Sequence, residues 1–124
     1  MRGDDERVLM AKMLREGDYI AGVDIGGTKM MAVVYDAKFK PKGRCRKKSK
    51  NGKKDEAAED RIFKVIDEAL ADAGRPAIKG IGVGSPGPLD PDRGVIIDTP
   101  NLGWKDFPLA AILAKRYGVP VVVD

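Results

Sequence analysis

The pattern of apolar positions changes repeatedly between a two-residue period and a helical period along this chain. Apolar, β-branched runs at 19–24 and 30–36 predict two strands, and 43–48 predicts a weaker third strand, exposed at an edge. Two short runs at 78–83 and 121–123 predict buried strands. Because helical segments separate the later strands, the pattern predicts an α/β domain.

Two segments have helical periodicity. Between Asp55 and Ala73, apolar residues at helical spacing form one face, which consists of Ile62, Phe63, Ile66, Ala69, Leu70 and Ala73. Acidic residues occupy the first turn, where the helix dipole favours them, and Gly74 follows the end. The second predicted helix begins at Asp106, as its N-cap, and ends at Tyr117 before Gly118.

The two first strands flank a tight turn, Gly26-Gly27-Thr28, which is typical of a hairpin. Glycines let backbone N–H groups approach a phosphate, and successive N–H groups in a turn can bind an anion. Thr28 adds a hydroxyl, Lys29 adds a positive charge, and Asp24 is placed to hold a hydrated Mg²⁺. The alternative is a plain Gly-Gly hairpin with an incidental aspartate.

This stretch resembles the first phosphate motif of the superfamily of sugar kinases, heat-shock chaperones and actin. Two more stretches, GVGSPGPLD at 82–90 and TPNLGWKDFPL at 99–109, follow in order. With all three, the chain from Tyr19 onward resembles the ROK family (repressor, open reading frame, kinase), known best for bacterial glucokinases and hexose kinases. The resemblance implies a ribonuclease-H-like domain of the actin/hexokinase superfamily. Its mixed five-stranded sheet would have the order 3-2-1-4-5 with flanking helices, the last two strands parallel to the first.

The resemblance also implies site residues. Asp24, Gly26, Gly27, Thr28 and Lys29 would bind the terminal phosphates of ATP, with Mg²⁺ on Asp24 through water. The loop that contains Gly87 would border the sugar, and Asn101 would hydrogen-bond sugar hydroxyls. Ligands of open α/β sheets bind at the carboxyl ends of the strands, where Asp24, the 84–88 loop and Asp124 are expected. The alternative for the 84–88 loop is a tight turn that only leads to a second turn at 90–94.

In function, the chain resembles the amino-terminal lobe of a glucokinase-like enzyme that transfers a phosphoryl group from ATP to a sugar 6-hydroxyl. The family's general-base aspartate is expected just beyond Asp124, so no catalytic residue is assigned here. Residues 1–18 would be an extension and 19–124 the lobe, truncated at its carboxyl end. We expect the isolated chain to lack turnover and to self-associate through uncovered apolar surface. The alternatives are a non-catalytic nucleotide- or sugar-binding module and a ROK-type repressor, which the eighteen residues before Tyr19 disfavour.

The net charge of +4 comes from one segment. Residues 38–54 hold ten Lys or Arg and no acidic residue, leaving 13 basic and 19 acidic residues elsewhere, a net of −6. Such a cluster can bind nucleic acid or another anionic surface, because clustered cations release counterions from phosphates. The segment has a single aromatic, Phe39, so we favour a charged edge strand and loop over nucleic-acid binding.

The single cysteine, with no histidine, excludes an internal disulfide and argues against a zinc site. Arg44 and Arg46 flank Cys45 and would lower the pKa of its thiol and raise its reactivity, but we favour the alternative of an inert strand residue. No apolar run approaches the ~20 residues of a membrane span, and no segment has the layout of a signal peptide. These features favour a cytoplasmic protein that acts on a small sugar.

Overall fold

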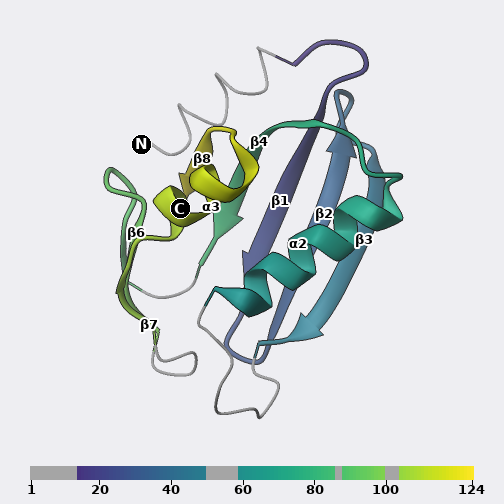
Figure 1. The fold of residues 1–124 in the computed structure, drawn as a ribbon. Helices are drawn as coiled ribbons and strands as arrows, with labels where there is room; N and C mark the ends of the chain where they lie inside the picture. Colours follow the sequence, from purple (N-terminus) through teal and green to yellow (C-terminus); the bar gives the residue numbers. More distant parts are fainter. Residues whose placement is uncertain (1–13, 50–58, 86–87, 100–103) are drawn as a thin grey trace.

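A five-stranded sheet with a helix packed on one face forms the centre of the molecule. The structure is a computed structural model, which describes residues 14–49, 59–85, 88–99 and 104–124. The sheet order is β3-β2-β1-β4-β8 (Figure 1). Its strands are β1 (Tyr19–Ile25), β2 (Lys29–Asp36), β3 (Pro41–Lys48), β4 (Ile78–Gly84) and β8 (Val121–Val123). Strands β1, β2 and β3 pair antiparallel, whereas β4 and β8 run parallel to β1, so the predicted order and directions are confirmed.

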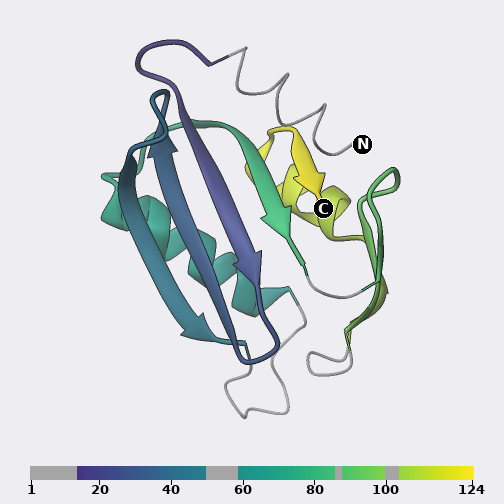
Figure 2. The same cartoon turned by 180° about the vertical axis from the view of Figure 1, so that it is seen from behind.

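Helix α2 (Asp60–Asp72) covers one face of this sheet. It lies in front of β1, β2 and β3 in Figure 1 and behind them in Figure 2, which shows the opposite face of the sheet. The buried residues of α2 are Ile62, Val65, Ile66 and Ala69. Val65 is buried although it was not part of the predicted apolar face. The predicted residues Phe63, Leu70 and Ala73 are only partly buried and pack against the core. The predicted helix start at Asp55 lies outside the described residues.

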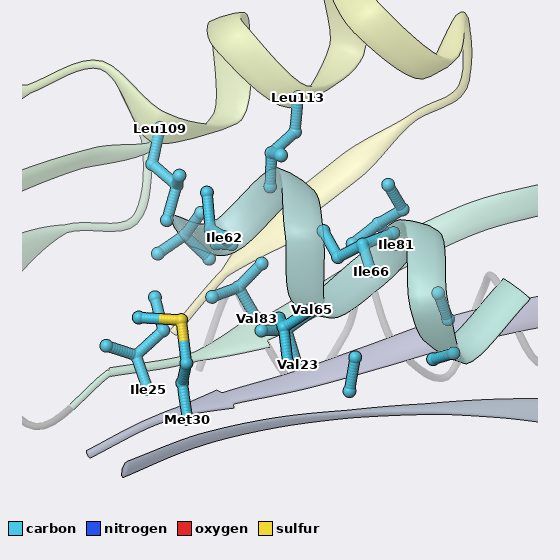
Figure 3. Close-up of a cluster of buried hydrophobic side chains, with 14 of the residues drawn as sticks. Val23, Ile25, Met30, Ile62, Val65, Ile66, Ile81, Val83, Leu109 and Leu113 are labelled. Carbon is cyan, nitrogen blue, oxygen red and sulfur yellow. The ribbon is translucent and has the colours of Figure 1, made fainter. Parts of the chain in front are cut away.

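The core lies between the covered face of the sheet and the two helices. Leu109 and Leu113 of α3 (Leu109–Tyr117) lie above Ile62 of α2, while Val23 and Val83 rise from the sheet below (Figure 3). Full burial of each such aliphatic side chain contributes roughly 1.5–3 kcal/mol.

Edge strand β3 approaches α2 closely at one glycine. A Cβ on Gly43 would lie 2.4 Å from the backbone nitrogen of Ala73 and 2.5 Å from the carbonyl oxygen of Ala69. The absence of a side chain therefore lets the helix pack directly on the strand.

A second, three-stranded sheet precedes α3 and was not predicted from the sequence. It consists of β5 (Leu89–Asp90), β6 (Val95–Thr99) and β7 (Trp104–Phe107), all antiparallel. The pairing of Ile96 with Phe107 keeps the chain extended there, so the predicted helix start at Asp106 is wrong. Asp106 lies in β7 with a φ of 47°, and Pro108 is the N-cap of α3.

The two helices are joined by a polar contact. Asp67 of α2 accepts hydrogen bonds of 2.7 Å from Arg116 and from the hydroxyl of Tyr117 on α3. The Arg116 guanidinium lies 4.3 Å from the centre of the Phe63 ring. Burial, and then the bond to Asp67, raise the pKa of Tyr117. None of the helices in the described residues has the length and apolar character needed to cross a membrane.

Candidate functional site

The β1–β2 hairpin places the predicted phosphate-binding turn at one end of the sheet. Ile25 pairs with Met30, and the N–H of Gly26 donates a 2.8 Å hydrogen bond to the carbonyl of Lys29. A Cβ on Gly26 would lie 2.6 Å from that carbonyl oxygen, so this position requires glycine. The hairpin is thus closed with Gly27 and Thr28 at its tip.

The tip offers backbone donors to an anion. Gly27, Thr28 and Lys29 are exposed. Within the described ranges, the N–H groups of Gly27 and Thr28 donate to no other group, whereas that of Gly26 is used inside the turn. Two consecutive N–H groups next to the cationic residue Lys29 in the chain form a suitable contact for a phosphate oxygen.

Ser49, which sequence reasoning missed, holds this turn from outside the hairpin. It follows the end of β3 and is 4% exposed. Its Oγ donates a 2.8 Å hydrogen bond to the carbonyl of Gly26, and its N–H donates one of 2.8 Å to the carbonyl of Thr28. The only signal in the sequence is a serine after a basic strand, which by itself indicates nothing.

Three strand ends meet beside the turn, as the sequence predicted. Asp24 pairs in register with Gly84. The N–H of Asp124 donates to the carbonyl of Val83 at 2.8 Å, and the N–H of Ser85 donates to the carbonyl of Asp124 at 3.0 Å. Asp24, Gly84 and Asp124 therefore lie side by side at the carboxyl edge.

The surroundings of Asp24 fit a hydrated divalent cation. Its carboxylate is exposed, and a Cβ on Gly84 would lie 3.9 Å from its Oδ1, so the glycine leaves space beside it. No group of three or more potential metal ligands occurs in the described part of the chain. Asp24 would therefore hold Mg²⁺ together with water and phosphate oxygens, which Mg²⁺ prefers.

An open groove of about 320 Å³ continues from Asp24 along the face of the sheet opposite α2. Its lining residues are Gly22, Val23, Asp24, Met31, Val33, Tyr35, Gly82, Val83 and Gly84. The predicted sugar residues Gly87 and Asn101 lie outside the described residues. Next to Gly87, the carbonyl of Pro88 accepts a 2.9 Å hydrogen bond from the N–H of Ile97. The turn that the sequence predicts at 90–94 is present in the structure.

The environment of Cys45 is not the one that its two sequence neighbours suggest. Burial and then the Glu68 carboxylate, whose Oε2 lies 3.3 Å from Sγ, raise the pKa of the Cys45 thiol. Arg44 and Arg46 are next to it in sequence but lie on the opposite face of β3. The lowering of the thiol pKa by the flanking arginines is therefore wrong, whereas the raised pKa agrees with the favoured interpretation of an inert strand residue.

Comparison with known proteins identifies relatives for nearly the whole chain. A family model described as "ROK family" matches residues 20–124. The glucokinase of Halalkalibacterium halodurans is 31% identical over 110 residues, which cover 86% of this chain and 33% of that protein. The xylose repressor of Caldicellulosiruptor bescii is 32% identical over 65 residues, which cover 51% of this chain and 16% of that protein.

Solved structures give the same result. The ROK hexokinase from Thermus thermophilus superposes with a TM-score of 0.71 at 34% identity, covering 86% of this chain and 34% of that one. The ROK family glucokinase from Streptomyces griseus, solved with glucose and AMPPNP, superposes with a TM-score of 0.70 at 28% identity. The match covers 86% of this chain and 32% of that one. The chain thus spans about a third of the length of these kinases.

Proposed function

Because this chain belongs to the ROK family, we propose that it is the phosphate- and sugar-binding lobe of an ATP-dependent hexose kinase. The reaction would transfer the terminal phosphoryl group of ATP to the 6-hydroxyl of a glucose-like sugar. The observation that carries the proposal is the juxtaposition of the Gly26–Lys29 turn, Asp24 and Asp124 at one sheet edge.

The roles of the residues follow from their chemistry. The N–H groups of Gly27 and Thr28 and the ammonium of Lys29 would hold the terminal phosphates. Asp24 would hold Mg²⁺ through water, and the metal would neutralise charge on the transferring phosphoryl group. Positioning and electrostatic stabilisation supply most of the catalysis of phosphoryl transfer, and this lobe would contribute both. Gly87 and Asn101 would contact the sugar, and a general base would come from outside this chain.

A second candidate is the sugar-sensing lobe of a repressor, supported by the xylose repressor relative. Such a lobe would bind its sugar without phosphoryl transfer. The two candidates differ in whether ATP is turned over when the rest of a kinase is supplied.

A chimeric kinase tests this difference. This chain would replace the matching third of the Thermus thermophilus ROK hexokinase, and turnover would be followed with ATP, Mg²⁺ and a panel of hexoses. The kinase proposal predicts turnover of glucose, which Asp24→Ala lowers by about 10²-fold or more with an unchanged KM for the sugar. A folded chimera that binds glucose but has no turnover would favour the sensing lobe. Turnover that Asp24→Ala leaves intact would refute the assigned role of Asp24.

A further inference from the structure

The turn between β2 and β3 presents an aromatic side chain to solvent, at the end of the sheet opposite the Gly26–Lys29 turn (Figure 1). Residues 38–42 are all exposed, and Phe39 is 51% exposed. A single exposed apolar residue is ordinary on a protein surface. The backbone of Phe39 is unusual, because its φ of 61° lies in the left-handed region, which is costly for a bulky residue.

Asp36 holds the turn in this shape. Its Oδ1 accepts hydrogen bonds from the N–H of Lys38 at 2.9 Å and from the N–H of Lys40 at 3.0 Å. The backbone of Asp36 accepts a 2.9 Å bond from the N–H of Phe39 and donates one of 3.0 Å to the carbonyl of Lys40. Hydrogen bonds around Phe39 therefore keep its backbone left-handed, while its ring stays exposed.

Positive charge surrounds this aromatic tip. Lys38 precedes Phe39 and Lys40 follows it, and both lysines are exposed. Within the described ranges, neither of them forms an ion pair. The Nζ of Lys42 lies 3.7 Å from Oδ2 of Asp36, so the one acidic residue of the turn faces a third lysine. The turn thus combines an apolar tip with free cations beside it.

We propose that this turn docks the chain on an anionic lipid surface. The Phe39 ring would enter the boundary between headgroups and acyl chains, where an apolar side chain is stabilised. Lys38 and Lys40 would lie at the lipid headgroups, because a lysine can bury its alkyl stem and keep its ammonium among the anions. A rigid turn loses little conformational entropy when it docks, which gives the costly backbone of Phe39 a purpose.

This proposal is independent of the kinase assignment. The Gly26–Lys29 turn lies at the other end of β2, so it would point away from a membrane that holds Phe39.

Edge protection and nucleic-acid binding fit the turn less well. Protection of an edge strand accounts for charge on β3 but not for an exposed aromatic residue before it. Single-stranded nucleic acid gains affinity from bases stacked on aromatic faces. The rings of Tyr35 and Phe39 lie 6.5 Å apart with planes at 55°, so they form no parallel slot for a base.

Flotation of the 124-residue chain with vesicles tests the proposal. The chain should bind an equal mixture of phosphatidylcholine and phosphatidylserine but not phosphatidylcholine alone, and added salt should weaken the binding. Phe39→Gly should weaken it by about 5- to 10-fold, because roughly half of an aromatic side chain is no longer taken out of water. The melting temperature of this variant should not fall, since glycine adopts the left-handed backbone freely. The matched control is Ile97→Ala, which removes a side chain that is 42% exposed on β6 and should leave vesicle binding unchanged.

The lysines are tested in the same assay. Lys38→Gln/Lys40→Gln should weaken vesicle binding by about 25-fold, taking roughly 5-fold for each lysine at an anionic surface. Lys105→Gln/Lys115→Gln removes two exposed lysines on β7 and α3 and should weaken it far less.

Insertion of the aromatic tip has its own signal. In Phe39→Trp, tryptophan emission should shift to the blue when the mixed vesicles are added. The unaltered chain supplies the baseline, because its single tryptophan, Trp104, is 2% exposed and should not respond.

Three results would overturn the proposal. The first is vesicle binding by Phe39→Gly as tight as that of the unaltered chain, and the second is an equal loss in the two double lysine variants. The third is equal or tighter binding of a single-stranded DNA that Phe39→Gly also weakens, which would assign the turn to nucleic acid. Asp24→Ala leaves this turn intact, so its vesicle binding should persist even if the assigned role of Asp24 is wrong.

Discussion

The Oγ of Ser49 donates a 2.8 Å hydrogen bond to the carbonyl of Gly26, across a contact that joins the end of β3 to the β1–β2 turn. The N–H of the same serine bonds the carbonyl of Thr28. These two carbonyls flank the N–H groups that we assign to the phosphate. A residue more than twenty positions away in sequence therefore fixes the shape of the turn.

Ser49→Ala should lower the free energy of unfolding by about 1–3 kcal/mol, because it removes the hydroxyl donor from the Gly26 carbonyl at a buried position. Ser85→Ala is the matched control. The Oγ of Ser85 is buried but has no hydrogen-bond partner in the described part of the chain, so its removal should change stability by less than about 0.5 kcal/mol. Urea denaturation of both variants measures the difference, and equal losses would contradict the assigned role of Ser49.

Gly26→Ala should destabilise the chain by about 2–3 kcal/mol, since the new Cβ would lie 2.6 Å from the Lys29 carbonyl oxygen. By contrast, a Cβ on Gly82 would meet nothing within 4 Å. Gly82→Ala should leave stability unchanged or raise it by up to about 1 kcal/mol through the unfolded state. Thermal melts measure the stability of the two variants. A melting temperature unchanged by Gly26→Ala would contradict the requirement for glycine in the closed turn.

Much of the fold follows from local sequence signals. Strands β1, β2, β4 and β8 have apolar runs, whereas β3 has only a weak signal, and Gly118 ends α3 in the left-handed conformation that glycine favours. The small sheet could not be predicted, because its short strands depend on pairing between Ile96 and Phe107 rather than on local pattern. Asp106 carries a helix N-cap signal, but this pairing overrides it.

Part of the candidate site could likewise be predicted from the sequence, and part could not. Asp24 and the turn are contiguous in sequence, so their chemistry is visible there. The bonds that Ser49 makes and the face on which Arg44 and Arg46 lie depend on strand register, which no single segment shows. For that reason the two arginines that flank Cys45 in sequence did not indicate the direction of its pKa shift.

Cys45 should react with iodoacetamide more slowly than a free model thiol near pH 8, because its raised pKa leaves less thiolate. Glu68→Gln removes the nearby negative charge and should speed the reaction, whereas Asp60→Asn, at the start of α2, should not. Mass spectrometry of the alkylated chain follows the rate. A rate equal to that of the model thiol would contradict the assigned environment.

Stability should fall as the pH rises above about 10, the ordinary pKa of tyrosine. Because the folded pKa of Tyr117 is raised, the unfolded chain loses this proton more readily, and alkaline pH favours unfolding. The stabilisation of the folded state by the protonated Tyr117 hydroxyl is complete below about pH 10 and is lost as the pH rises further. Tyr117→Phe should therefore show a shallower alkaline decline in melting temperature, and parallel declines would contradict the assignment.

The most direct measurement is a titration of the isotopically labelled chain with AMPPNP and Mg²⁺, followed by the NMR shifts of its backbone amides. We predict that the largest shifts occur at Gly27, Thr28 and Lys29, and that Asp24→Asn abolishes their dependence on Mg²⁺. Shifts centred elsewhere, or shifts at the turn that keep their Mg²⁺ dependence in Asp24→Asn, would contradict the claim that this hairpin binds the nucleotide phosphates.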